Sequence, residues 1–256
     1  MFDLEVVGQG RTTKIYRDGD TAIKLYENAS PDAAYNEAEK QRFAHGAGLP
    51  APAVFGVREL GGGLVALDMA YIDGKPLIKP RMDKNERTDA INVLVQLQCA
   101  VHNVKADGLP KLTDRMKRFI GGTPWLDGAH KDILLNMLAR LDDGRDSLCH
   151  GDIHPLNILN DGVKYWIIDW VDATAGCPLA DACRTYLIFK YYISRSAGIY
   201  LRAFCKRANV RHEGVLAWLP VVAAARLHEN MDDRERIWLK NIAVSACNES
   251  LSDLRA

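Results

Sequence analysis

One segment near the middle of the chain places two acids and an amide at spacings that suit phosphoryl transfer. Asp152 lies in the string HGDIHPLNIL, Asn157 follows it by five residues, and Asp169 follows it by seventeen, in IIDW. A carboxylate can orient and deprotonate an attacking hydroxyl, while an amide oxygen and a second carboxylate can hold Mg²⁺, which prefers hard oxygen ligands and keeps several waters. We therefore expect Asp152 to be the catalytic base, and Asn157 and Asp169 to bind the metal.

The same segment also allows simpler interpretations. A lone Asp or Asn in a loop is usually a turn former or a cap, and this alternative applies to Asp152. His150 and His154 are four residues apart, as in a helical zinc pair. Gly151 lies between them and Pro155 follows directly, so a regular helix is not expected. We expect His150 to brace the loop through backbone hydrogen bonds.

The segment resembles the catalytic loop and metal-binding motif of the aminoglycoside phosphotransferase and choline kinase-like family. CHGDIHPLNIL is similar to the family's HGDxxxxN pattern at every specified position, and IIDW is similar to its metal-binding strand end. The resemblance implies an α+β, protein-kinase-like fold of two lobes, with a small β-rich N-lobe and a larger, mainly helical C-lobe. It implies transfer of the γ-phosphate of ATP or GTP to a hydroxyl of a small molecule that is aminoglycoside-, amino alcohol- or sugar-like.

Two short stretches near the N-terminus could contact a nucleotide. Gly8 and Gly10 lie between two apolar stretches, and glycine lets backbone amides approach phosphates closely. Such a pair equally predicts an ordinary hairpin turn. Lys24 interrupts the apolar run 21–26 and resembles the strand lysine that contacts nucleotide phosphates in kinases. Without that role, it would be an outward-facing, solvated strand residue.

A lysine of this kind needs an anionic partner, and the following segment offers two. Pro31 and Asp32 predict a helix start, and the helix is expected to end near residues 46–48. Glu37 and Glu39 both lie on it but point about 200° apart around the helix, so they cannot both face one lysine. Glu37 matches the family's Glu-Ala pair better, so we expect a Lys24–Glu37 pair.

The character of the chain changes near residue 73. Before it, apolar runs at 54–57 and 64–69 flank a triple-glycine turn, which predicts a hairpin. After it, apolar residues recur at helical spacing, and His102 on the first long helix is expected near the core. We therefore expect an N-terminal nucleotide-binding lobe over 1–72 and a C-terminal catalytic and substrate-binding lobe over 73–256.

The nature of the phosphate acceptor stays open at the level of sequence. A protein kinase would carry a long activation segment after the metal-binding acid, whereas this chain enters a predicted helix within about ten residues of Asp169. A small hydroxylated molecule is therefore the better acceptor. A nucleotide-binding pseudokinase that serves as an interaction module would have lost the base, a metal ligand or the strand lysine, and all three are present.

The helices of the C-terminal half contain further charged residues. Asp181 and Arg184 lie in a stretch that resembles the family's DxxRT sequence, and their spacing of three predicts a structural ion pair on one helix. Four acids farther on could form an acidic pocket for a cationic acceptor: Glu229, Asp232, Asp233 and Glu235. Arginines are mixed with these acids, so a solvated helix face is equally consistent with the pattern.

Composition limits the remaining possibilities. The 256 residues include 33 acids and 33 bases, so net charge predicts neither a nucleic-acid nor an anionic-membrane partner. The longest apolar run, 215–225, is too short to span a bilayer, and the start of the chain has no signal-peptide pattern. The six cysteines include no Cys-x-x-Cys pair and are expected to be free buried thiols of a cytoplasmic protein. Oligomeric state and the choice between ATP and GTP stay open.

Overall fold

The computed structural model describes residues 4–10, 13–27 and 31–253. The chain divides into two compact units, of which the first comprises Met1–Asp83 with Pro155–Ala173, and the second Lys84–His154 with Thr174–Ala256. We expected a lobe boundary after residue 72, with 155–173 in the C-terminal lobe. In the structure, 155–173 belongs to the first unit because one of its strands pairs with residues 75–76 and the turn that follows packs on the helix at 31–46.

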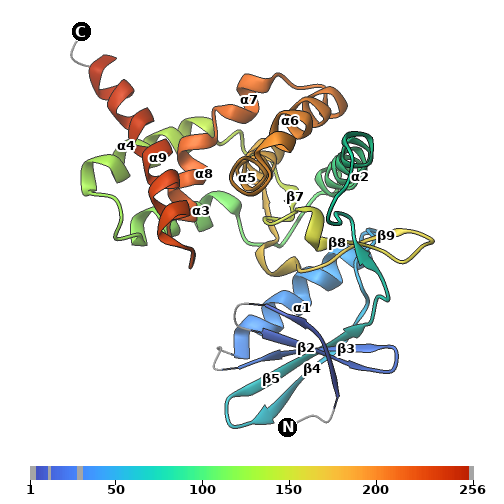
Figure 1. The fold of residues 1–256 in the computed structure, drawn as a ribbon. Coiled ribbons are helices and arrows are strands. Elements are labelled where there is room, and N and C mark those ends of the chain that lie inside the picture. Colours follow the sequence, from blue (N-terminus) through green and yellow to red (C-terminus); the bar gives the residue numbers. More distant parts are fainter. Residues whose placement is uncertain (1–3, 11–12, 28–30, 254–256) are drawn as a thin grey trace. The chain divides into compact units, whose positions relative to one another are not determined.

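The first unit is built on a five-stranded antiparallel sheet with one helix after its third strand (Figure 1). Its strands are β1 (Glu5–Gln9), β2 (Thr13–Asp18), β3 (Thr21–Tyr26), β4 (Val54–Gly61) and β5 (Leu64–Ala70), in the order β1-β2-β3-β5-β4. The expected hairpin between β4 and β5 is confirmed. Its turn uses Gly61, Gly62 and Gly63, all with positive φ, a conformation that glycine adopts without steric cost.

Helix α1 (Pro31–Gly46) packs against β4 and β5 through small side chains. Ala34 and Ala38 are fully buried in a cluster that includes Tyr26 of β3. Alternate strand residues point to the same face of a sheet, so Lys24, two residues before Tyr26, also faces the α1 side. The central position of β3 therefore buries Lys24 rather than exposing it.

A second, three-stranded sheet completes the first unit. It contains β6 (Lys75–Pro76), β8 (Ile158–Asn160) and β9 (Tyr165–Ile167), in the order β6-β8-β9. A 3₁₀ turn precedes β8 (η1, Pro155–Asn157), and another follows β9 (η2, Trp170–Asp172). Trp170 is fully buried, its Nε1 donates to the Ile167 carbonyl at 3.0 Å, and η2 packs against α1. This packing anchors the chain directly after Asp169.

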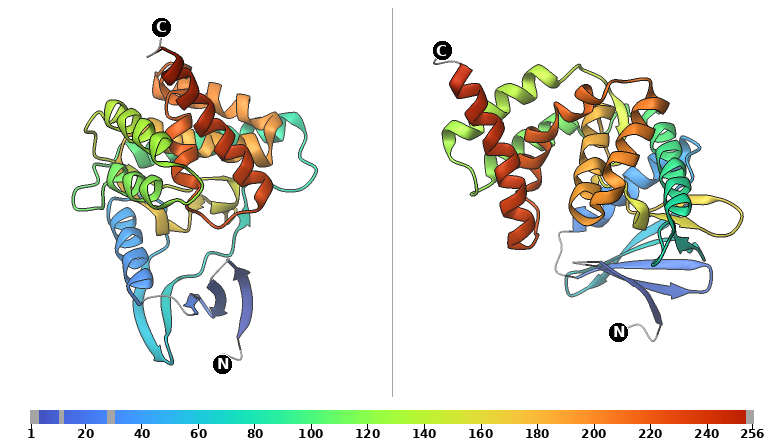
Figure 2. Two further views of the ribbon diagram at one scale, coloured as in Figure 1. Left: turned by 90° about the vertical axis from the view of Figure 1, so that its left-hand side faces the viewer. Right: turned by 45° about the horizontal axis from the view of Figure 1, so that its top comes forward.

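The second unit is mainly helical. Its helices are α2 (Lys84–His102), α3 (Leu112–Gly122), α4 (Gly128–Leu141), α5 (Pro178–Tyr192), α6 (Ser194–Ala208), α7 (His212–Leu216), α8 (Leu219–Arg226) and α9 (Asp233–Asp253). Helix α5 packs on α6, α7 and α8, and α2 lies beside α6 (Figure 2). Helix α5 also contacts β7 (Ser147–Cys149), which pairs with β10 (Thr174–Gly176).

Several expectations from the sequence can be compared with the burial pattern. His102 is buried on α2, as expected for a core histidine. Five of the cysteines are buried free thiols, while Cys99 is half-buried. Within the part of the chain that the structure describes, no helix combines the length and apolar character needed to cross a membrane.

Candidate active site

The first unit contains a buried lysine held by two carboxylates. Lys24 Nζ lies 2.8 Å from Glu37 Oε1 and 2.9 Å from Asp169 Oδ1. Glu37 is 1 % exposed and also accepts a hydrogen bond from the Tyr26 hydroxyl, whereas Glu39 is exposed. The expected Lys24–Glu37 contact is therefore present, and the solvent-facing alternative for Lys24 is wrong. The direct contact between Lys24 and Asp169 was not expected from the sequence.

Burial and charge act in opposite directions on this cluster. Burial lowers the pKa of Lys24, but Glu37 and Asp169 raise it above its ordinary value, so the ammonium stays charged at neutral pH. Burial raises the pKa of Glu37 to about 7, against the opposing effect of Lys24. Lys24 is thus a fixed cation, while Glu37 can exchange a proton near neutral pH.

Asp169 has an unusual backbone conformation directly after β9. Its φ of 66° and ψ of 66° place it in the left-handed region, which aspartate tolerates better than most residues. Residues held in this region often mark functional sites, because the surrounding structure must offset the strain. The side chain of Asp169 is 43 % exposed, so its carboxylate contacts Lys24 and remains accessible.

The β8–β9 hairpin sets the position of Asn157 relative to Asp169. Ile158 pairs with Ile167, and the Ile168 N–H donates to the Asn157 carbonyl at 3.0 Å. Asn157 therefore sits directly before β8, opposite the residue that precedes Asp169. Asn157 and Asp169 flank the two ends of one hairpin. Although they are twelve residues apart in the chain, the hairpin brings them close together.

The glycine pair lies at the β1–β2 connection. Gly8 ends a register shift in the β1–β2 ladder, and the Gly10 N–H donates to the Thr13 carbonyl at 2.8 Å. A Cβ at Gly10 would lie 2.7 Å from the Thr13 hydroxyl, so this position favours glycine. Residues 11 and 12, between Gly10 and β2, lie outside the described residues.

In the second unit, Asp152 lies in the loop after β7 and is surrounded by basic side chains. Arg184 Nη2 donates to Asp152 Oδ1 at 3.1 Å, and His154 Nε2 lies 3.4 Å from Asp152 Oδ2. The Asp152 N–H donates to His150 Nδ1 at 3.2 Å, so His150 braces the loop backbone as expected. The Asp152 side chain is 29 % exposed and therefore open to a ligand.

These neighbours determine the charge of Asp152. Burial alone would raise the pKa of its carboxyl, but Arg184, together with His154 and His150, holds that pKa well below its usual range. Asp152 is consequently an anion at neutral pH. Its carboxylate can accept a hydrogen bond from a hydroxyl group, and the Arg184 guanidinium fixes its position.

Helix α5 holds this loop through two other residues. Asp181 is buried, accepts the Gly151 N–H at 2.7 Å, and faces His102 Nε2 at 2.8 Å. The Thr185 hydroxyl donates to the Ile153 carbonyl at 2.9 Å. The predicted Asp181–Arg184 ion pair is wrong. Asp181 points to the loop backbone and α2, whereas Arg184 pairs with Asp152 and with Glu229, which follows α8.

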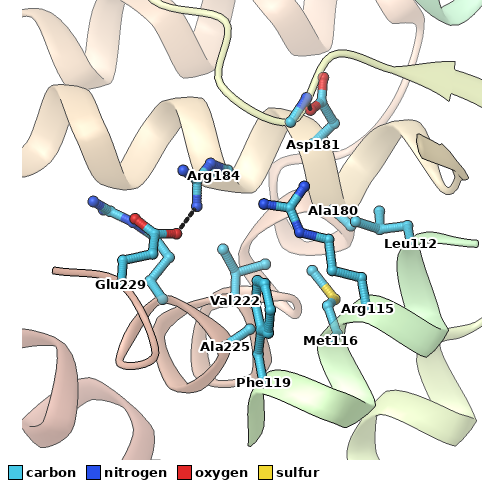
Figure 3. Close-up of a pocket in the computed structure, with 12 residues that line it drawn as sticks. Leu112, Arg115, Met116, Phe119, Ala180, Asp181, Arg184, Val222, Ala225 and Glu229 are labelled. Atoms are coloured by element: carbon cyan, nitrogen blue, oxygen red, sulfur yellow. Dashed lines mark hydrogen bonds and ion pairs between the residues drawn. The ribbon is translucent and has the colours of Figure 1, made fainter. Parts of the chain in front are cut away.

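A small pocket opens beside Asp152 in the second unit. Figure 3 shows Arg115 and Phe119 of α3, Arg184 of α5, and Glu229 around it, with Arg184 bonded to Glu229. Of the four acids that could have formed an acidic pocket, Glu229 alone lines this one. Glu235 is buried and pairs with Arg226, and Asp233 pairs with Arg236 on the exposed side of α9.

The chain matches the model of the phosphotransferase enzyme family over residues 3–228. It belongs to this family. The family's members transfer phosphoryl groups to hydroxyls of small molecules, so the chain is a small-molecule phosphotransferase. No curated protein matches its sequence significantly.

Solved structures of similar fold extend the comparison beyond the family model. A thermostable variant of aminoglycoside phosphotransferase APH(4)-Ia, in ternary complex with ADP and hygromycin B, matches with a TM-score of 0.72 and 15 % identity over 96 % of this chain and 93 % of that one. Choline kinase LicA from Streptococcus pneumoniae matches with a TM-score of 0.70 and 14 % identity over 97 % and 94 %. These likenesses confirm the α+β, protein-kinase-like fold that the sequence predicted.

Two features of this phosphotransferase site were not recognised in the sequence. The contact of Arg184 with Asp152 joins residues that are 32 apart in the chain, so helix periodicity could not reveal it. The buried contact of His102 with Asp181 joins residues that are 79 apart. The resemblance to DxxRT was the available signal for Arg184, but local spacing assigned it the wrong partner.

Proposed function

We propose that this chain is a Mg²⁺-dependent kinase that transfers the γ-phosphate of ATP or GTP to a hydroxyl of a small molecule. The single observation that carries the proposal is the Lys24–Glu37–Asp169 cluster, in which a strand lysine is held charged and buried by two carboxylates. A structural ion pair would not require the second carboxylate to be 43 % exposed in a left-handed conformation. Family membership supports this assignment.

In this proposal, the first unit binds the nucleotide. Lys24 donates to its phosphates, and Glu37 positions Lys24. The backbone at Gly8 and Gly10 approaches the phosphates, and at Gly10 a Cβ would collide with the Thr13 hydroxyl. The structures of APH(4)-Ia with ADP and with AMP-PNP support a nucleotide co-substrate for a chain of this fold.

The donor set of Asn157 and Asp169 fits Mg²⁺. Both offer hard oxygens, and the hairpin brings them to one end of β8 and β9. Within the described residues, no group of three or more His, Cys, Asp or Glu side chains could hold a metal ion, so water and phosphate oxygens would complete the shell around one carboxylate and one amide. Bound there, Mg²⁺ would neutralise charge on the transferring phosphate.

In this proposal, Asp152 orients and deprotonates the acceptor. The acceptor hydroxyl donates to the Asp152 carboxylate and is oriented by it. The hydroxyl oxygen forms the new O–P bond, the bond from the γ-phosphorus to the β–γ bridging oxygen breaks, and the hydroxyl proton passes to Asp152. A carboxylate with a low pKa is a weak base, but it suffices because the loose transition state of phosphoryl transfer requires little prior activation of the nucleophile.

Two variants test the separate roles proposed for Asp169 in metal binding and for Asp152 in catalysis. Asp169→Asn removes the charge of the proposed metal ligand and should weaken Mg-ATP binding measured by calorimetry. Asp152→Asn should leave that binding nearly unchanged and lower acceptor phosphorylation at least about 10²-fold. Melting temperatures of both variants control for folding. Unchanged Mg-ATP binding in Asp169→Asn, or parent-level turnover in a folded Asp152→Asn, would refute the assignment.

An active kinase differs in one measurable respect from a pseudokinase that serves as an interaction module. A pseudokinase could bind nucleotide but would not release nucleoside diphosphate in response to any hydroxylated molecule. Retention of Lys24, Asn157, Asp169 and an ionised Asp152 supports the enzyme. A screen of hydroxylated metabolites and aminoglycosides for acceptor-stimulated nucleoside diphosphate release distinguishes the two.

A further inference from the structure

Both oxygens of the buried Glu37 carboxyl are bonded to side chains of one strand. Lys24 of β3 donates to Oε1 at 2.8 Å, and the Tyr26 hydroxyl, two residues farther along β3, donates to Oε2. Alternate residues of a strand point to the same face, so these two side chains reach α1 side by side. The orientation of Glu37 therefore depends on Tyr26 as well as on Lys24.

The packing around Tyr26 fixes the position of its hydroxyl. Strand β3 lies between β2 and β5 in the sheet, so its backbone is paired on both sides. The residue is 5 % exposed and packs in one cluster with Ala34 and Ala38 of α1, the helix that carries Glu37. Lys24 Nζ lies 5.7 Å from the centroid of the Tyr26 ring, within the range of a cation–π contact. The hydroxyl is thus held against Glu37 by the surrounding core.

A tyrosine hydroxyl suits both protonation states of Glu37. A phenol both donates and accepts hydrogen bonds, whereas an ammonium only donates. When Glu37 is ionised, Tyr26 donates to Oε2. When Glu37 is protonated, the proton can lie on Oε2 and be donated to the Tyr26 oxygen, so Oε1 still accepts from Lys24. The arrangement therefore presents an acceptor to Lys24 in either state.

The groups that face Glu37 make both states accessible near neutral pH. Burial raises the pKa of its carboxyl to about 7; Lys24 opposes this shift, Asp169 adds to it, and Lys40 of α1 opposes it. Because Asp169 also contacts Lys24 at 2.9 Å, the ammonium keeps a second carboxylate partner when Glu37 takes up a proton. The position of that proton on Glu37 then decides whether the contact with Lys24 persists.

We propose that Tyr26 is a positioning residue of the nucleotide site, which fixes Glu37 so that Oε1 faces Lys24 as an acceptor whether or not Glu37 carries a proton. The inference rests on the proposed function, in which Lys24 binds the nucleotide phosphates. Without the phenol, nothing keeps the proton of Glu37 on Oε2. A proton on Oε1 would face the Lys24 ammonium, donor against donor, and the two groups would separate.

The substitution Tyr26→Phe tests this role, because it removes the hydroxyl and keeps the ring. Calorimetry measures the Kd of Mg-ATP for parent and variant from about pH 6 to about pH 8.5, a range that spans the titration of Glu37. The variant-to-parent ratio of Kd should be about 10 at the acidic end, as for loss of one hydrogen bond, and should fall toward about 2 at the basic end. Titration of the nucleotide itself is common to both proteins and cancels in the ratio.

The matched control is Tyr16→Phe, because Tyr16 is a buried tyrosine of β2 that packs in the other cluster of the same sheet. Its Kd ratio should stay near 1 at every pH, and melting temperatures of all variants control for folding.

A second variant, Glu37→Gln, mimics the protonated acid. Its amide nitrogen can donate to Tyr26 while its carbonyl accepts from Lys24. Mg-ATP binding should therefore stay within about 3-fold of the parent, and adding Tyr26→Phe should weaken it about 10-fold.

The outcomes separate the role of Tyr26 from the proposed function. A Kd ratio for Tyr26→Phe that is near 1 or constant with pH, or an equal response of Tyr16→Phe, would overturn the positioning role. So would a Glu37→Gln protein whose Mg-ATP binding is insensitive to Tyr26→Phe. If Mg-ATP binding still requires Lys24 and Asp169 in those cases, the proposed function stands. If the parent protein binds no Mg-ATP, the proposed function fails, and the role of Tyr26 fails with it.

Discussion

The protonation of Glu37 is the property of this site with the most direct consequence for stability. Glu37 is 1 % exposed and bonded to Lys24 and Tyr26, and burial raises its pKa from 4.5 to about 7. A carboxyl whose pKa is higher in the folded protein holds its proton more tightly there than in the unfolded chain. Folding is therefore favoured at low pH, and that contribution is lost as the pH rises from about 4.5 through about 7.

The substitution Glu37→Gln removes this titration while keeping the shape of the side chain. Each pKa unit corresponds to about 1.36 kcal/mol, so the rise from 4.5 to about 7 corresponds to about 3 kcal/mol. Between pH 4.5 and pH 8, the parent protein should therefore lose about 3 kcal/mol of stability relative to Glu37→Gln. An ordinary exposed salt bridge would lower the carboxyl pKa and produce a change of opposite sign.

Urea unfolding of both proteins across this pH range measures the difference. Trp166 and Trp170 lie in the first unit and contribute to the fluorescence signal. Glu39→Gln is the matched control, because it makes the same chemical change on an exposed residue of the same helix and should show no such trend. A parent-minus-variant difference for Glu37→Gln that is flat with pH, or that rises with it, would refute the argument from burial.

Two further predictions follow from contacts in each unit. Lys24→Ala and Glu37→Ala should each reduce turnover, and their double-mutant cycle should be strongly non-additive because the side chains touch at 2.8 Å; fully additive losses would contradict this contact. Gly176→Ala places a Cβ 2.5 Å from the Leu112 Cβ and should cost about 1–3 kcal/mol of unfolding free energy. Gly121→Ala is the control: its Cβ would meet no atom within 4 Å, so this change should be neutral or stabilising by up to about 1 kcal/mol. Equal effects of the two glycine substitutions in calorimetric melts would contradict the clash at Gly176.

Sequence spacing by itself determined those parts of the site that depend on local geometry. The helical repeat showed that Glu37 and Glu39 cannot both face Lys24, the resemblance to the family's Glu-Ala pair selected Glu37, and the observed contact with Lys24 agrees with that choice. The hairpin with its three glycines and the core position of His102 were likewise predicted, because turn chemistry and apolar periodicity act over a few residues. The fold class followed from the resemblance of one long motif.

Tertiary structure decided the partners that lie far apart in the chain. Arg184 could have paired with Asp181 on its own helix, but the helix orientation directs it to Asp152 and Glu229 instead. The segment 155–173 joined the first unit because its strand β8 pairs with β6, a preference that its own sequence does not show. Of the acids that could have formed a pocket, Glu235 and Asp233 pair with arginines instead, and only Glu229 lines the pocket beside Asp152, together with arginines from three elements. The charge of a pocket depends on which side chains converge from distant segments, and only packing sets that convergence.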